Sequence, residues 1–194
     1  MKLWLYHFFV VGCLTVYFDL LTYPLVTFGI PIAFMVSQYT KDFKTGLKMF
    51  IETGILWVTG YGAMWASKWI LGTLVTGNNV LTSAVDAMKF RTSNGYDDAV
   101  FNVLDVIKTN LNRADFPVEI IILLFAVCII VGLIKKIKVS FRIIPMLCIA
   151  ILPFIWYAVL SNHSWIHPWM TYRELAIFVY ALMTVGMMFV YKND

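Results

Sequence analysis

The sequence predicts an all-α, polytopic integral membrane protein with six transmembrane helices, and two observations support this fold class. Of the 194 residues, 61% are hydrophobic and 13% are charged, and the mean hydropathy is +0.80. A soluble domain is about half apolar and a quarter charged, so these charges are too few to cover a surface in water. Apolar runs of roughly 20 residues, the length that crosses a bilayer, also recur along the chain. Soluble enzymes, disordered regulators and disulfide scaffolds are therefore disfavoured.

Six spans account for the apolar runs, and together they form a single transmembrane domain over residues 1–194. Four runs are unambiguous and give spans near 49–72, 117–134, 143–160 and 175–191. The first 39 residues are apolar almost throughout, and one helix of that length would measure about 55 Å, far more than the hydrocarbon thickness. The polar and helix-breaking residues of this stretch are Asp19, Thr22, Tyr23 and Pro24. We expect the chain to turn there, which gives spans near 3–21 and 23–39.

The distribution of basic residues predicts the orientation of the spans. With both termini in the cytoplasm, nine of the fifteen Lys and Arg residues fall on the cytoplasmic side, which carries a net charge of +6. The outer side carries a net charge of −2. Short cytoplasmic loops of membrane proteins are rich in Lys and Arg, so this orientation is favoured over its inverse. The positive charge thus indicates membrane lipid as a partner and not nucleic acid.

Residues 73–116 are predicted to form a structured loop on the outer side. We expect two amphipathic helices in it, because apolar residues recur there at helical spacing. The first stripe consists of Leu81, Ala84, Val85 and Met88, and the second of Val100, Val103, Leu104, Ile107 and Leu111. We place Asp97 and Asp98 in the first turn of the second helix, where the helix dipole favours acidic side chains. Such helices form either a structural cap or a lid over a substrate site.

Charged residues near the spans are the first candidates for function, since each costs about 2.5–3.5 kcal/mol to insert at the centre of a membrane helix. Glu52 lies one turn after Lys48, and an ion pair explains it without a functional role. Lys68 lies near the outer end of the 49–72 span, where it reaches the surface or serves a site. Asp19 has no basic residue within one helical turn, so we expect its partner to come from elsewhere in the fold.

The outer connection 161–174 contains two histidines, two tryptophans, a tyrosine and an arginine, on the same predicted side as Asp19. Zinc binding is disfavoured, because Pro168 biases His167 away from the helical geometry that its spacing from His163 would need. A serine nucleophile is disfavoured as well, because no glycine-flanked serine elbow is present. We therefore predict no metal cluster and no nucleophile of the hydrolase kind.

We interpret the polar residues of this outer end as an anion site for a phosphate group. The substrate-binding residues are Lys68, Tyr172 and Arg173, and the catalytic candidates are Asp19, His163 and His167. The guanidinium of Arg173 would bind phosphate oxygens in a fork, and a histidine would transfer a proton. Asp19 would be a general base or the ligand of a divalent cation, the only cofactor considered. The alternative is a hydrogen-bonded network that ties the first hairpin to the bundle.

Two segments carry a resemblance to a known group of proteins. They are FDLLTYPLVTFGIP at 18–31 and LSNHSWIH at 160–167, the latter followed by Tyr172 and Arg173. They resemble motifs in the carboxyl-terminal half of large, mostly uncharacterised bacterial polytopic membrane proteins, which are distantly similar to GT-C glycosyltransferases. The resemblance implies a multi-pass protein of the bacterial plasma membrane that acts at the outer face on a polyprenyl-phosphate-linked sugar. It also implies a membrane-protein partner, or a missing half, that supplies amino-terminal spans and the catalytic acid of the family.

The sequence thus predicts a GT-C-like glycosyltransferase, or the carboxyl-terminal part of one. A small transporter or lipid flippase is the alternative, because Pro24, Pro31, Pro145 and Pro153 would supply the broken helices that transporters use. A subunit without chemistry of its own is the third hypothesis. For the first hypothesis, Asp19 and Arg173 are expected on the same side of one outer cavity.

Overall fold

The computed structural model describes residues 4–19, 21–114, 118–137, 141 and 143–191. Nearly all of this part is helical, which confirms the all-α class. The helices are α1 (Trp4–Phe18), α2 (Val26–Tyr39), α3 (Phe43–Thr76), α4 (Val80–Arg91), α5 (Val103–Arg113), α6 (Val118–Ile134), α7 (Ile143–Val159), α8 (Ser161–Ile166), α9 (Pro168–Thr171), the 3₁₀ turn η1 (Tyr172–Glu174) and α10 (Leu175–Val190). The strands β1 (Gly95–Tyr96) and β2 (Ala99–Val100) form a short antiparallel hairpin.

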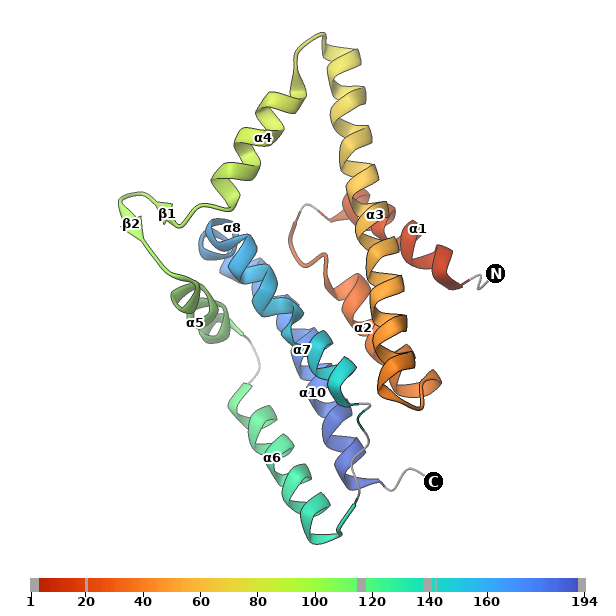
Figure 1. Cartoon of the computed structure of the whole chain (residues 1–194). Coiled ribbons are helices and arrows are strands. Elements are labelled where there is room, and N and C mark those ends of the chain that lie inside the picture. The colour runs from red at the N-terminus through yellow and green to blue at the C-terminus, as the bar shows by residue number, and fades with distance from the viewer. Residues whose placement is uncertain (1–3, 20, 115–117, 138–140, 142, 192–194) are drawn as a thin grey trace.

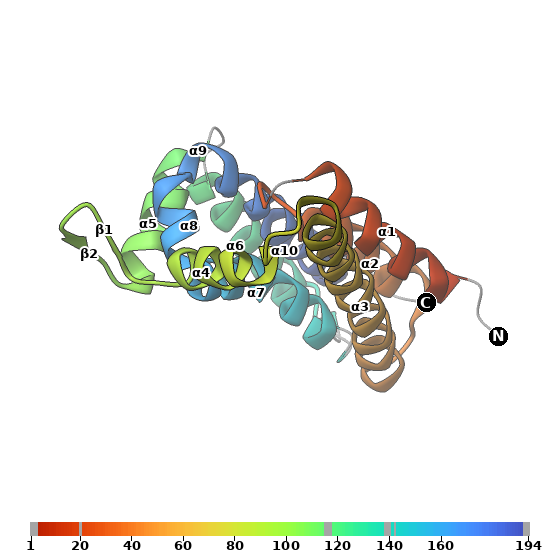
Figure 2. The ribbon, with the colours of Figure 1, turned by 90° about the horizontal axis from the view of Figure 1, so that it is seen from above.

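The long helices form two groups that meet at α2. In one group α1 packs on α3, and in the other α10 packs on α6 and α7; α2 contacts members of both groups. Figure 1 shows α4, α5 and α8 at one end of the molecule, here called the α8 end, while the α2–α3 and α6–α7 connections lie at the other. Figure 2 shows the β1–β2 hairpin projecting on the side opposite α1. Most of the long helices therefore begin and end near the two ends of the molecule.

The principal core lies between α2, α7 and α10. Its centre consists of side chains with at most 1% exposure, among them Ile32, Val36, Ile149, Ile177 and Val185. Burying an apolar side chain of this size contributes about 1.5–3 kcal/mol. These side chains lie far from the α4 and α5 segments in the sequence, and the core contains no residue of either helix.

Glycine allows α1 and α3 to cross at very short range. A Cβ atom on Gly60 would collide with the backbone oxygen of Phe9, and one on Gly12 would collide with that of Trp57. Small residues at such positions let two helix backbones approach closely. The backbone carbonyl of Gly60 also accepts a hydrogen bond from the Cys13 thiol at 3.2 Å. The crossing therefore fixes the position of α1 on α3.

Each of the six predicted spans contains one long helix, but the helix lengths differ from the predicted ones. α3 has 34 residues and continues to Thr76, four residues into the segment predicted as a loop. It ends at Gly77, whose φ of +69° is the left-handed conformation that closes a helix. By length and composition, only the segment Pro168–Val190 could cross a membrane alone within the described residues. α1, α2 and α7 are apolar but shorter.

The segment predicted as an outer loop contains two helices, α4 and α5, which cover the first predicted stripe and the second from Val103 onward. Val100, predicted as part of the second helical stripe, lies instead in β2 and is 90% exposed. The prediction for Asp97 and Asp98 was wrong. They form the turn between β1 and β2, with φ values of 47° and 64°, and tight hairpin turns require such positive φ values. α5 begins instead at a capping box, in which Asn102 accepts from the Asp105 backbone N–H and the Asp105 side chain accepts from that of Asn102.

Candidate functional site

The turn between α1 and α2 meets the segment before α10 at the α8 end. His163 Nε2 lies 2.8 Å from the Leu21 carbonyl oxygen, and the Arg173 guanidinium lies 5.6 Å from the centre of the Tyr23 ring. Since Tyr23 N–H also donates to the Asp19 carboxylate at 3.1 Å, a single turn connects Asp19, His163 and Arg173. The structure thus brings together two segments more than 140 residues apart.

Asp19 finds its partners within its own turn, which corrects the expectation of a partner from elsewhere. Its carboxylate accepts from the backbone N–H of Thr22 at 2.8 Å, from the Thr22 hydroxyl and from the Tyr23 N–H. Burial raises the pKa of Asp19, and the two backbone donors oppose this rise. A turn-stabilising carboxylate of this kind is typical of Asp at helix ends. Asp19 is consequently committed to three hydrogen bonds from neighbouring residues.

His163 and His167 lie side by side, with ring centres 5.0 Å apart. The backbone at His167 is not helical, with φ −119° and ψ 46°, as the following proline favours. Burial lowers the pKa of His163 to about 4 and also lowers that of His167. Both rings are therefore neutral near pH 7. His167 Nδ1 is buried and has no hydrogen-bond partner within the described residues.

Lys68 belongs to α3, and its side chain contacts the C-terminal end of α1. Its ammonium donates to the Val16 carbonyl at 2.8 Å and lies 5.7 Å and 5.4 Å from the ring centres of Tyr17 and Trp65. A cation at this position satisfies a free carbonyl at the end of a helix and complements the helix dipole. The contacts described for Lys68 thus hold α1 on α3.

Arg173 is exposed beside two tyrosines, since its guanidinium lies 5.8 Å from the Tyr172 ring as well as over Tyr23. Within the described chain, Arg173 makes no ion pair. Its donors are therefore available to an anion at the surface. Arg173 contacts the ring of Tyr23 and Asp19 accepts from its backbone N–H, but neither residue lines the cavity described below, so their predicted place in one cavity stays a prediction.

Glu174 is a site residue that the sequence interpretation missed. Its side chain is 0% exposed, and Oε1 accepts from the Leu25 N–H at 3.0 Å, while Oε2 has no partner in the described chain. Leu25 is the N-cap of α2 and provides no side-chain cap. A carboxylate 149 residues away thus caps α2.

Polar side chains of α8 attach the end of α4 and the residues after it to the bundle. Ser161 donates to Ser93 O and Asn94 Oδ1, and Asn162 Nδ2 donates to Phe90 O at 2.7 Å. These bonds hold the C-terminal end of α4. Asn162 is 0% exposed, so the Asn-His-Ser sequence at 162–164 is inaccessible as a glycosylation site in this fold.

A cavity of about 510 Å³ lies between α3, α4 and the end of α7, and we call it the α3–α4 cavity. This volume is in the range of roughly 300–1,000 Å³ typical of small-molecule sites. Its walls are mostly apolar and aromatic: Leu21, Tyr61, Gly62, Trp65, Trp69, Ala84, Ala87, Met88, Arg91, Thr92, Trp156, Val159 and Leu160. The residue that connects this cavity to the predicted site is Leu21, because its carbonyl bonds to His163.

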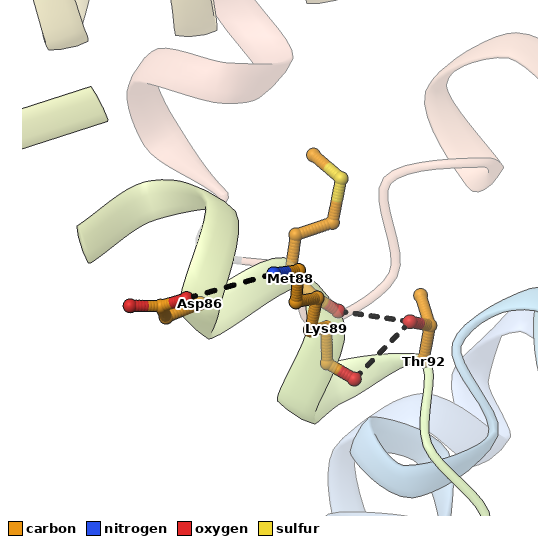
Figure 3. Close-up of polar contacts among 4 residues, drawn as sticks. All are labelled: Asp86, Met88, Lys89 and Thr92. Atoms are coloured by element: carbon orange, nitrogen blue, oxygen red, sulfur yellow. Dashed lines mark hydrogen bonds and ion pairs between the residues drawn. The ribbon is translucent and has the colours of Figure 1, made fainter. Parts of the chain in front are cut away.

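Arg91 is the charged residue in the cavity wall. It lies in the last turn of α4 and makes no ion pair in the part of the chain that is described. Lys89, two residues earlier, is exposed and lies 4.0 Å from Asp86 on the same helix (Figure 3). Figure 3 also shows Thr92 donating to the Met88 and Lys89 carbonyls, which closes the helix beside the cavity. The two cations of α4 thus have different environments.

The unpaired polar atoms of the cavity wall are hydrogen-bond donors. Trp156 Nε1 and the Tyr61 hydroxyl are buried, and neither has a hydrogen-bond partner among the described residues. Indole Nε1 can only donate, and a guanidinium carries five donors and no acceptor. Both of these atoms are covered by protein and not exposed to the cavity, so the donors that a ligand in the cavity could reach are those of Arg91.

Sequence reasoning missed Arg91, although a signal for it existed. The predicted stripe Leu81, Ala84, Val85 and Met88 reaches position 91 with one further step of three residues. Arg91 therefore lies on the apolar face of α4, and this face lines the cavity. The position of Arg91 on the otherwise apolar face of α4 was the sequence signal for a candidate anion site.

The described residues contain no group of three or more His, Cys, Asp or Glu side chains that could hold a metal ion. The guanidinium groups of Arg91 and Arg173 can bind an anion, and the neutral imidazoles of His163 and His167 can transfer a proton. Comparison with protein-family models, with curated proteins and with solved structures finds no match to this chain.

Proposed function

We propose that this chain is a multi-pass membrane protein that binds a lipid-linked phosphate in the α3–α4 cavity. In this proposal α1, α2, α3, α6, α7 and α10 cross the bilayer, both termini are cytoplasmic, and the α8 end faces outward. The observation that carries the ligand class is an unpaired arginine, Arg91, in a cavity whose other walls are mainly apolar and aromatic.

Exposed apolar surface supports the membrane location. On α6 the exposed side chains include Ile122, Leu123, Ile130 and Leu133, with exposures of 50–70%. Soluble monomers rarely expose contiguous apolar patches of this kind, and surrounding hydrocarbon would remove their contact with water. The short helices then require a locally thin bilayer or polar ends that extend to its surface.

The chemistry of the cavity supports an anionic amphiphile as ligand. Its aromatic wall, with Trp65, Trp69 and Trp156, suits an isoprenoid or other hydrocarbon chain. The five donors of the Arg91 guanidinium suit phosphate oxygens. A neutral lipid would leave the arginine unpaired, and a cationic lipid would be repelled by it.

Glycosyl transfer from a polyprenyl-phosphate sugar is the reaction we propose for the bound ligand, in line with the sequence resemblance. Leu21 supports this connection, because its side chain lines the cavity while its carbonyl bonds to His163. His163 and His167 are the proposed proton carriers, and Asp19 is proposed to act from the same turn. Arg173, Tyr172 and Lys68 do not line the cavity, and they are proposed to bind the sugar-phosphate outside it.

Binding of polyprenyl phosphate and of the uncharged polyprenol to protein in nanodiscs tests the proposal. Tryptophan fluorescence reports binding, since three tryptophans line the cavity. We expect wild type to bind the phosphate at least about tenfold more tightly than the alcohol, and Arg91→Gln to lose this preference. Lys89→Gln removes the same charge from the same helix and is expected to retain it. Equal affinity of wild type for the two lipids would contradict the proposal.

A further inference from the structure

The segment 21–25 forms part of the cavity wall and is held at three alternate residues. The Leu21 carbonyl bonds to His163 at 2.8 Å, the Tyr23 ring lies under Arg173, and the Leu25 N–H donates to Glu174 at 3.0 Å. All three holding residues belong to the connection between α7 and α10. The two hydrogen bonds thus fix the first and the last residue of the segment.

This segment has a backbone conformation that needs such support. Leu21 has φ +66°, in the left-handed region that bulky side chains rarely adopt. Strained residues of this kind persist when surrounding structure holds them, and they often lie at ligand sites. Leu21 also lines the α3–α4 cavity, so a change in its backbone conformation would move the cavity wall.

Glu174 has features that a purely structural cap does not need. Its carboxylate is 0% exposed, and burial of a carboxylate is costly unless its hydrogen bonds repay the cost. A serine, threonine or aspartate near position 25 would cap α2 locally, but the chain has Pro24 and Leu25 there. The Leu25 N–H depends instead on an acceptor that also determines where the segment sits against α10.

We infer that Glu174 is a positioning residue for the α3–α4 cavity, which it affects by fixing Leu25 and thereby the Leu21 wall. This inference rests on the proposed function for its ligand. Glu174 does not touch the ligand, and the necessary feature is a hydrogen-bond acceptor at the position of Oε1. A neutral acceptor of the same length should therefore replace it.

Three variants separate this role from a general effect on folding. Glu174→Gln keeps an acceptor at the same reach, Glu174→Asp keeps the charge but shortens the side chain, and Glu174→Ala removes both. We expect Gln to retain the affinity for polyprenyl phosphate within about threefold. We expect Glu174→Asp and Glu174→Ala to bind polyprenyl phosphate about tenfold more weakly, because the buried Leu25 N–H loses its acceptor. Glu52→Ala, at an exposed ion pair on α3, is the control and should bind like wild type.

Two readouts distinguish positioning from charge effects. Asp and Ala should weaken the binding of polyprenyl phosphate and of polyprenol by the same factor, because the wall and not the anion site has moved. Hydrogen–deuterium exchange should rise at the backbone amides of Thr22, Tyr23 and Leu25 and stay unchanged in the α2 core. The inference would be overturned if Glu174→Gln lost affinity for polyprenyl phosphate. It would also be overturned if Glu174→Asp had the same hydrogen–deuterium exchange and affinity as wild type. If wild type does not prefer the phosphate, the proposed function fails, whereas exchange and polyprenol binding still test the positioning role.

Discussion

The imidazole of His163 in α8 bonds to the carbonyl oxygen of Leu21 at 2.8 Å, across 142 residues of chain. His163 is only 7% exposed and Leu21 lines the α3–α4 cavity. This hydrogen bond joins the turn between α1 and α2 to the connection before α10. The stability of that junction should therefore depend on the protonation of a single ring.

Acidification should destabilise the fold through His163. The pKa of this ring is about 4 in the folded protein and about 6.5 when the chain is unfolded. Between these values the unfolded state binds a proton that the folded state does not, so the free energy of unfolding falls as pH falls from about 6.5 to 4. Thermal unfolding in detergent should show a loss of at most about 3 kcal/mol over this range.

His163→Gln should remove this part of the pH dependence, because Gln can donate to Leu21 and does not titrate. A profile of His163→Gln that matches wild type would show that other groups cause the acid sensitivity.

The crossing of α1 and α3 should tolerate no side chain at Gly60. Gly60→Ala places a Cβ against the Phe9 backbone and should lower the free energy of unfolding by about 1–3 kcal/mol, the usual cost of overpacking. Gly62→Ala is the matched control, since its Cβ meets nothing within 4 Å. In a helix interior this control should stabilise by about 1 kcal/mol. Chemical unfolding should therefore give opposite signs for the two variants.

α5 should detach when Asn110 is removed. This side chain is 0% exposed; it donates to the Ser164 carbonyl at 3.1 Å and accepts from the Thr171 hydroxyl at 2.7 Å. Asn110→Ala removes the side-chain donor of the Ser164 carbonyl, at about 1–3 kcal/mol, while the Thr171 hydroxyl can still donate to the His167 carbonyl at 3.1 Å. We expect faster proteolysis in residues 92–102, while Asn112→Ala, at an exposed position of the same helix, should be digested like wild type. Equal digestion of both variants would show that apolar contacts alone hold α5.

The proposed membrane orientation predicts which residues can be labelled from each side. In a background without Cys13, Cys128 and Cys148, Thr82→Cys should react with an impermeant maleimide from outside the cell. Lys44→Cys should react only after the membrane is permeabilised. Both positions are exposed, so reactivity reports the side of the membrane and not burial. Labelling of both from the same side would contradict the six-span arrangement.

The positions of the long helices could be predicted because apolar runs and stripes persist over many residues. The ends of elements could not, since they depend on single residues. α3 continues past its apolar run until Gly77 adopts φ +69°, and Asp97 and Asp98 adopt positive φ values where a helix turn was expected. Local conformations of this kind are determined by turn geometry, which periodicity does not reveal.

The candidate site could be predicted as two meeting segments but not as a set of contacts. Asp19 and Arg173 both contact Tyr23, but neither lines the α3–α4 cavity, so the expectation that they share one cavity stays a prediction. The expectation that the partner of Asp19 comes from elsewhere in the fold was wrong. Its partners include backbone N–H groups, which every residue but proline has and which therefore give no sequence signal. Glu174 was missed because it lies at the end of a predicted span. A carboxylate there is expected at the membrane–water interface, and only the structure shows that this one is buried.

α4 buries none of its own residues and is absent from both hydrophobic clusters of the described chain. Its position depends on the Gly77 turn and on the bonds from Ser161 and Asn162 to the residues at its C-terminal end. The core can therefore remain intact while α4 changes. In the proposed function, ligand preference depends on Arg91 in α4 and fold stability on the core. Substitutions in α4 are therefore expected to change the preference without repacking of α2, α7 or α10.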